Sequence, residues 1–272
     1  MTTNPTVLIP LPAFDFDPTE CAVPWLILHA RGVRLSFATP TGEPADCDGR
    51  MLTGKGLGLF SGLLAAKNQA RAAYEKMRQS EEFKKPISWS SVKSSDFDGI
   101  LLPGGHAPGM RPYLESEILQ ALVVEFFDAA KPVGAICHGV VLAARSCKDG
   151  ISVLRGRKVT SLLASQELFA WAITRLWLGN YYRTYPQTVE AEVRSCLGSP
   201  KDYVPGPMPL LRDSPAHLSR GFALRDRNFV TARWPGDAHA FASEFLKLLL
   251  KPAPEESPRS AIADSRSDAR SE

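Results

Sequence analysis

The stretch Val133-Gly134-Ala135-Ile136-Cys137-His138-Gly139-Val140 decides how this chain is expected to fold. An apolar run leads straight into a cysteine, with one glycine three positions before it and another two positions after it. Small neighbours permit a sharp turn from a strand into a helix, which lifts the side chain at the turn above the sheet. At such a turn Cys137 lies at a helix N-terminus, where the dipole favours its thiolate. The stretch therefore predicts a nucleophile elbow rather than a buried structural cysteine beside a histidine.

Short apolar runs alternate with longer amphipathic ones on both sides of this stretch. Strands that alternate with helices indicate a mostly parallel sheet that is covered on both faces. We therefore predict an α/β fold, a three-layer sandwich of the doubly wound, flavodoxin-like type. The expected strands are 7–11, 33–38, 99–102, 133–136 and 158–162, and the expected helices are 18–31, 114–130 and one that begins at Gly139.

Two segments interrupt the alternation. Residues 54–83 hold a glycine-rich stretch and a helical run, and residues 169–197 are rich in aromatic side chains, with a second helix after Pro186. Both are candidates for helical cap insertions at one end of the sheet. Ordinary surface helices with aromatic side chains packed inward fit the two segments equally well.

The last part of the chain contains a hairpin, a helix and a tail. Residues 222–225 and 228–232 flank a turn and read as two antiparallel strands, and residues 238–251 form a last amphipathic helix. Residues 252–272 contain five serines and no aromatic residue, so they bury too little to offset the entropy of ordering. We expect one domain over residues 1–251 and a disordered tail over residues 252–272.

Composition narrows the class of protein. The five cysteines are widely spaced and odd in number, which argues against a disulfide framework and a zinc ribbon and favours free thiols. The 32 basic and 29 acidic residues are spread along the chain, so no basic stripe for a nucleic acid is expected. No apolar run is long enough for a membrane span, and no basic segment precedes an apolar one as in a signal peptide. We expect a cytoplasmic protein that binds neither membrane nor nucleic acid.

A second stretch, Pro103-Gly104-Gly105-His106, follows the expected strand 99–102. Paired glycines after a strand leave backbone N–H groups free to approach a ligand, as an oxyanion hole requires. An ordinary glycine turn would have the same sequence. The stretch is a candidate oxyanion hole because the expected fold brings it beside the elbow.

A third stretch, residues 15–20, offers a carboxyl group with two interpretations. Asp17 as N-cap and Glu20 three positions later fit a capping box, and from these residues alone this structural interpretation of Glu20 is the stronger one. A helix after the first strand nevertheless begins at the same edge of the sheet as the elbow. Glu20 is therefore also a candidate partner of Cys137.

The combination of Glu20 in DPTECAVPW, Pro103–His106 and the elbow GAICHG resembles the ThiJ/PfpI family of the class I glutamine amidotransferase-like superfamily. The branch of glutathione-independent glyoxalases (glyoxalase III) and heat-shock chaperone-type proteins is the most similar one. The resemblance covers roughly residues 5–250. It implies Cys137 as nucleophile, Glu20 as acidic partner, His138 as neighbouring base, and the N–H groups of Gly105 and His138 as oxyanion hole.

The resemblance also implies roles at less well matched positions. Some family members complete a triad with an acidic residue after the strand that follows the elbow helix, and Glu167 is the nearest candidate, in a poorly matching segment. His106 matches a position near a metal in some relatives, but a lone histidine there is more typical of a pocket lining, so we expect no metal. Neither His217 nor His239 is followed two residues later by glutamate, which argues against glutaminase activity.

The leading hypothesis is a cofactor-independent lyase that converts small α-oxoaldehydes, such as methylglyoxal, into 2-hydroxy acids through a Cys137 hemithioacetal. The substrate carries both the oxidised and the reduced carbon, so no redox cofactor is required. One alternative is a stress chaperone with Cys137 as a redox-sensing thiol. Another is a specialised hydratase, a hydrolase or an accessory enzyme of a biosynthetic pathway. Whether the protein forms a homodimer is left open by the sequence. Cys137 is expected to have a lowered pKa and to be the most reactive of the five thiols.

Overall fold

The structure, a computed structural model, describes residues 4–250. A seven-stranded sheet forms its middle layer, in the spatial order β10-β11-β7-β6-β1-β3-β5. β10 runs antiparallel to β11, and all the other neighbouring strands are parallel. The strands are β1 (Thr6–Pro10), β3 (Arg34–Thr39), β5 (Ile87–Ser88), β6 (Gly99–Leu102), β7 (Val133–Ile136), β10 (Ala223–Asp226) and β11 (Phe229–Ala232). The predicted mostly parallel sheet is confirmed.

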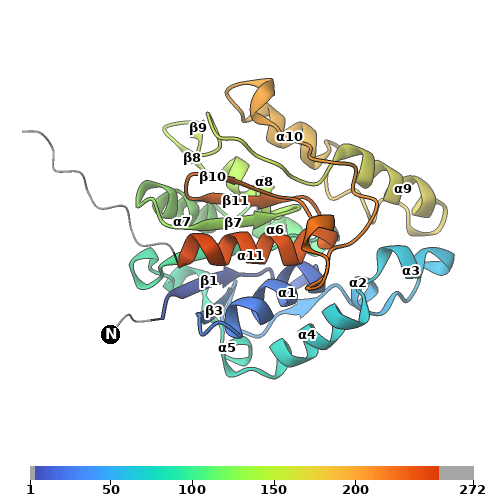
Figure 1. Ribbon diagram of the computed structural model, residues 1–272, viewed down its shortest axis with the longest axis horizontal. Coiled ribbons are helices and arrows are strands. Elements are labelled where there is room, and N and C mark those ends of the chain that lie inside the picture. The colour runs from blue at the N-terminus through green and yellow to red at the C-terminus, as the bar shows by residue number, and fades with distance from the viewer. Residues whose placement is uncertain (1–3, 251–272) are drawn as a thin grey trace, which may run out of the picture.

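Helices cover both faces of this sheet (Figure 1). One face carries α1 (Pro18–His29), α4 (Asn68–Gln79) and α11 (Ala238–Leu249), and the other carries α6 (Arg111–Leu114), α7 (Glu117–Asp128) and α8 (Gly139–Arg145). The predicted hairpin and helices are present, with ends shifted by a few residues. The shorter elements are β2 (Phe14–Phe16), β4 (Asp46–Cys47), α2 (Gly49–Thr53), α5 (Glu81–Lys84), β8 (Cys147–Lys148) and β9 (Ile151–Ser152).

The central strands are apolar throughout because both of their faces are covered. Every residue of β6 and β7 is buried, as expected for parallel strands between two helical layers. Glycine is required at position 134 of β7 for a steric reason. A Cβ there would lie 2.9 Å from the Phe245 ring and 3.0 Å from the Phe241 ring of α11. This close packing holds β7, and therefore the elbow at its end, tightly against α11.

Two segments form a cap at one end of the sheet. The turn η1 (Gly58–Phe60) and α3 (Ser61–Leu64) belong to the first, and α9 (Ala164–Leu178) and α10 (Val189–Ser195) to the second. Figure 1 shows α3 and α9 at the same end of the molecule. The rings of Phe60 and Trp177 stack there with centroids 6.3 Å apart. The cap interpretation is thus confirmed, except that α4 of the first segment packs against α1 as an ordinary covering helix.

The strand predicted over residues 158–162 is wrong. Only Val159 makes a β-bridge there, with Tyr203. The edge of β11 that such a strand would need is occupied by β10, and the N–H of Thr160 donates instead to the Thr231 hydroxyl of β11, at 3.1 Å. The segment therefore runs past the sheet without joining it. The tail predicted over residues 252–272 lies outside the described residues.

Candidate active site

Cys137 lies between β7 and α8 in a strained backbone conformation. Its φ is +57°, in the left-handed region that residues other than glycine rarely adopt. A Cβ on the next glycine, Gly139, would lie 2.1 Å from the carbonyl oxygen of Leu102, so only glycine fits. The Cys137 side chain is 4% exposed and lines a pocket. These features confirm the predicted nucleophile elbow.

Glu20 faces Cys137 from the first turn of α1. Its carboxyl lies close enough to the Cys137 thiol for each group to affect the pKa of the other, and its Oε2 accepts the N–H of Gly104 at 3.0 Å. It does not close a capping box, because the N–H of Asp17 donates to the carbonyl oxygen of Gly104 at 2.8 Å. Asp17 caps the helix alone, accepting from the N–H groups of Thr19 and Glu20. The capping-box interpretation of Glu20 is therefore wrong, and its carboxyl lines the pocket of Cys137 instead.

Burial controls the protonation of this pair. It raises the pKa of Glu20 well above its ordinary value, and the nearby Asp17 carboxylate adds to this shift. Burial likewise raises the pKa of the Cys137 thiol, and the charge of Glu20 acts in the same direction. The expectation of a lowered thiol pKa is wrong, because desolvation outweighs the N–H of His138 and the short helix behind it. Both shifts favour the protonated forms of the two groups.

His138 is oriented as a proton acceptor for the thiol. Its Nδ1 lies 3.5 Å from the Cys137 Sγ, and its Nε2 lies 3.0 Å from the Thr184 hydroxyl oxygen. Thr184 donates its only hydroxyl proton to the carbonyl oxygen of His106, at 2.6 Å. It therefore accepts from Nε2–H, which leaves Nδ1 unprotonated and facing the sulfur. Burial lowers the pKa of His138 to about 3, so the ring is neutral at pH 7.

Thr184, which sequence reasoning missed, occupies the position predicted for Glu167. The carboxylate of Glu167 accepts the N–H of Val189 at 2.9 Å and lies 3.3 Å from Nε of Arg183. Its oxygens are thus engaged at the start of α10 and not at His138. Glu167 still lines the pocket, but the third-partner assignment is corrected. Thr184 follows two tyrosines in an irregular segment, and no motif in the sequence marks it.

The two predicted oxyanion-hole donors approach the same pocket. The N–H of Gly105 makes no hydrogen bond within residues 4–250. The N–H of His138 lies beside the Cys137 sulfur and lowers the pKa of that thiol slightly against the larger effect of burial. Gly105 has φ +154°, and a Cβ there would lie 2.7 Å from the carbonyl oxygen of Asp15. The arrangement suits a negative oxygen that develops next to the sulfur.

The pocket above Cys137 has a volume of about 180 Å³ and a mostly apolar wall. Four buried polar atoms of its lining residues lack a hydrogen-bond partner in the described part of the chain: Glu20 Oε1, His106 Nε2, Gln166 Oε1 and Trp234 Nε1. Buried polar atoms normally have partners. Their convergence on one pocket indicates a site that takes a ligand with several polar groups. Apolar side chains such as Leu63, Leu162, Phe169, Ala170 and Leu210 form most of the remaining wall.

His106 lines this pocket beside the cap. Its ring stacks on Tyr182, with centroids 4.2 Å apart, and burial lowers its pKa to about 3. Within residues 4–250, no group of three histidine, cysteine, aspartate or glutamate side chains is arranged to hold a metal ion.

A family model described as ThiJ/PfpI family-like matches residues 11–207. The chain belongs to this family. Among curated relatives, a deglycase of Thermococcus kodakarensis is 26% identical over 163 residues, which cover 60% of this chain and 69% of that protein. An uncharacterised protein of Schizosaccharomyces pombe is 30% identical over 149 residues, which cover 54% of this chain and 53% of that protein. The chain thus spans about half the length of the second relative.

Solved structures of the same fold extend over nearly the whole chain. Glyoxalase III of Candida albicans has a TM-score of 0.62 and 19% identity, over 89% of this chain and 96% of that one. The rapid encystment protein of Francisella tularensis has a TM-score of 0.66 and 17% identity, over 91% and 100% of the two chains. These likenesses establish the family fold. None of the helices within residues 4–250 is both long and apolar enough to span a bilayer.

Proposed function

We propose that this ThiJ/PfpI family member is a cysteine-dependent enzyme that converts α-oxoaldehydes into 2-hydroxy acids without a cofactor. The observation that carries the proposal is the arrangement around Cys137. A thiol, a carboxyl whose pKa is raised by burial and a histidine nitrogen with a free lone pair meet beside a mostly apolar pocket. The names of a deglycase and of a glyoxalase III among the similar proteins support a carbonyl substrate.

The first half of the proposed reaction forms a hemithioacetal. Nδ1 of His138 takes the thiol proton, and the sulfur of Cys137 adds to the aldehyde carbon. The N–H groups of Gly105 and His138 stabilise the developing oxyanion, and protonated Glu20 gives it a proton. A raised pKa suits this role, because Glu20 holds its proton until the oxyanion forms.

The second half moves a proton between two carbon atoms. Glu20, now a carboxylate, removes the hydrogen from the carbon bonded to sulfur, and the hydroxyl proton on that carbon passes to the neighbouring oxygen, which gives an enediolate. It then delivers this proton to the neighbouring carbon, so that a thioester of a 2-hydroxy acid results. Water then hydrolyses the thioester: its oxygen bonds to the acyl carbon, the sulfur leaves and regains the proton held by His138, and the remaining proton of water returns to Glu20. The overall change is the addition of one water molecule, with no net oxidation of the substrate.

The test is lactate formation from methylglyoxal, without glutathione, nicotinamide or added metal. We expect Cys137→Ser to reduce the rate to background, because a hydroxyl in the same place is a far weaker nucleophile. Cys147→Ser is the matched control, because this exposed thiol is remote from the pocket wall, and it should keep the wild-type rate. Equal rates for wild type and Cys137→Ser would overturn the mechanism. A wild type inert toward every α-oxoaldehyde would favour a specialised hydratase or hydrolase.

A chaperone function is a second candidate, because large apolar side chains are exposed on and near the cap. Leu59 is 99% exposed, Leu176 90% and Met208 78%. Surfaces of this kind bind other apolar surfaces. Suppression of aggregation of a heat-unfolded client protein that survives Cys137→Ser would support this function independently of catalysis. Failure to protect the client at a several-fold molar excess would contradict it.

A further inference from the structure

Arg212 is a cation in the wall of the Cys137 pocket without a carboxylate partner. Its Nη2 donates to the carbonyl oxygens of Leu63 and Leu64, at 3.2 and 3.0 Å. The guanidinium also lies over the ring of Trp234, 5.1 Å from its centroid. Within residues 4–250 it forms no ion pair, although twelve other basic residues, two of them histidines, do. A partly buried cation of this kind usually has an anionic partner.

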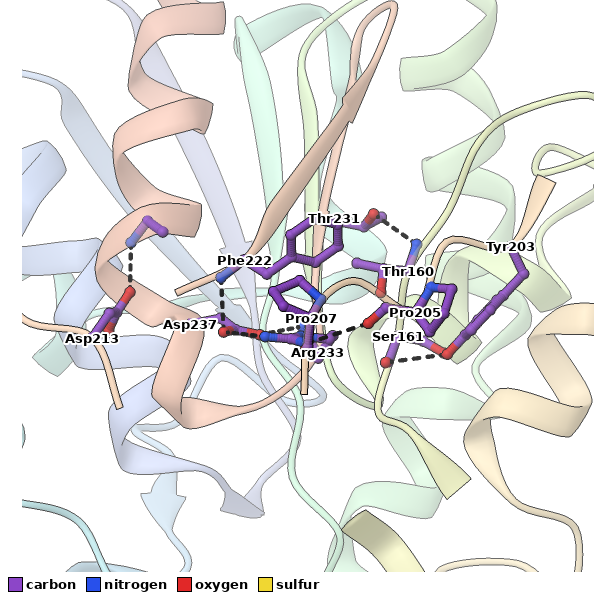
Figure 2. Close-up of polar contacts among 11 residues, drawn as sticks. Thr160, Ser161, Tyr203, Pro205, Pro207, Asp213, Phe222, Thr231, Arg233 and Asp237 are labelled. Carbon is purple, nitrogen blue, oxygen red and sulfur yellow. Dashed lines mark hydrogen bonds and ion pairs between the residues drawn. The ribbon is translucent and has the colours of Figure 1, made fainter. Parts of the chain in front are cut away.

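The loop that carries Arg212 is held in place at both ends (Figure 2). At its start, the fully buried Arg233 donates to the carbonyl oxygens of Pro205 and Pro207, and it is itself paired with Asp237 at 2.8 Å. At its end, Asp213 accepts the N–H of Ala240 at 2.7 Å, at the start of α11. Arg212 is therefore presented to the pocket by a rigid support and not by a free surface loop.

The nearby carboxyl groups do not neutralise Arg212 fully. Burial raises the pKa of Glu20 well above its ordinary value, so its negative charge is disfavoured. Asp17 is ionised at neutral pH, but its carboxylate is already engaged by two N–H groups at the start of α1. The buried indole N–H of Trp234 adds a second donor without a partner to the same pocket. The polar end of the pocket that faces Arg212 thus offers hydrogen-bond donors and positive charge.

We propose that Arg212, with the indole N–H of Trp234, binds a carboxylate on the substrate, so that the site takes α-oxoaldehydes with an acidic group at the end of an apolar stem. The inference rests on the proposed function for the aldehyde end only. The planar guanidinium matches the two oxygens of a carboxylate. A single cation in a mostly apolar wall suits one negative charge better than a doubly charged phosphate. The apolar side chains that line the same pocket would then contact the stem.

The first test does not depend on turnover. The N-iodoacetyl derivative of 4-aminobutanoate and its methyl ester alkylate the same thiol and differ only in the charge at the far end of a short stem, so their relative rates at Cys137, followed by peptide mass spectrometry, report a carboxylate site. We expect Arg212→Met to lower the acid-to-ester rate ratio about 10-fold, which corresponds to about 1.4 kcal/mol. Arg212→Lys should retain part of the ratio. Arg175→Met, on the exposed face of α9, is the matched control and should retain all of it. An unchanged ratio in Arg212→Met would overturn the proposal.

The second test uses 4,5-dioxopentanoate and its methyl ester, two α-oxoaldehydes that differ only in the charge of the far end. We expect wild type to prefer the acid, and Arg212→Met to lose about 10-fold in kcat/KM for the acid, mainly through KM, with the ester little affected. Equal losses for both would indicate a purely structural Arg212 and overturn the subsite. A wild type inert toward both, with the alkylation ratio still dependent on Arg212, would leave the carboxylate site standing and refute the proposed reaction. Stronger protection of Cys137 by inorganic phosphate than by pentanoate would refute the carboxylate preference.

Discussion

Glu20 illustrates how one side chain is assigned its role by its neighbours. Its position three residues after an N-cap is typical of a capping box, yet the N–H that such a box would use donates to Gly104. The carboxyl turns instead toward the sulfur of Cys137, in a place with very little access to water. Desolvation raises its pKa and so favours the protonated form, which is the state in which it can donate to an oxyanion.

Replacing Glu20 with glutamine tests this role directly. Glutamine keeps the shape and still accepts the N–H of Gly104, but it has no proton to exchange. We expect turnover with methylglyoxal to fall by about 10²-fold or more. The free energy of unfolding should change by less than about 1 kcal/mol, because the hydrogen bond is preserved and no charge has to be buried. The two quantities are measured by lactate formation and by urea unfolding at pH 7.

Near-normal turnover in a stable Glu20→Gln protein would show that His138 or another group moves the proton. The position of Glu20 at the sulfur could be anticipated from the sequence, because the helix after the first strand begins at the edge where the elbow lies. The raised pKa of the Cys137 thiol could not be anticipated from the sequence. It depends on side chains from distant parts of the chain that exclude water from the pocket, and local patterns do not carry that information.

At the scale of elements, the elbow and the cap each supply residues to the site. β7 and α8 present Cys137 and His138, whereas the irregular segment between α9 and α10 supplies Thr184, which fixes the tautomer of His138. The elbow is encoded locally, by glycines that permit a close approach, and so the sequence predicts it. The cap is encoded by tertiary packing of aromatic and apolar side chains, so a single threonine in it gives no local signal.

Thr184→Val removes the hydroxyl while keeping the side-chain volume nearly constant. The buried Nε2–H of His138 then lacks an acceptor, and the orientation of Nδ1 toward the sulfur is no longer enforced. We expect kcat/KM with methylglyoxal to fall about 10-fold, with an altered pH–rate profile, and Thr184→Ser to restore most of it. Thr174→Val is the matched control, because Thr174 is an equally buried threonine whose hydroxyl donates to a backbone carbonyl within α9. A similar loss in both variants would indicate general destabilisation.

The strand predicted over residues 158–162 marks a second limit of sequence reasoning. Val159 and Leu162 are apolar, and residues 159–162 are all buried, as in a strand. Residues 158–162 and β10 could each pair with the free edge of β11. β10 occupies this edge because a two-residue turn connects it directly to β11. A hairpin closes a short loop at small entropic cost, whereas the other pairing would join distant parts of the chain.

At the scale of the whole molecule, the fold gathers acidic groups at the carboxyl ends of its parallel strands. Asp17 and Glu20 are both almost fully buried there, and burial raises the pKa of each. A carboxyl whose pKa is higher in the folded state than in the unfolded state binds its proton more tightly when folded. Its contribution to stability is therefore complete below the unfolded pKa and is lost as the pH rises through the folded pKa. At neutral pH the buried acidic groups therefore lower the free energy of unfolding, and the apolar core must offset this loss.

Asp17→Asn measures this cost. Burial raises the pKa of Asp17 from 3.8 to about 6, so wild type should lose up to about 3 kcal/mol of its free energy of unfolding from this group between pH 4 and pH 7. Asparagine also caps a helix well and does not titrate. We expect the variant to gain on wild type as the pH rises over this range, as measured by urea unfolding at intervals of half a pH unit. A difference between the two proteins that stays constant from pH 4 to pH 7 would show that Asp17 is not held with a raised pKa in the folded state.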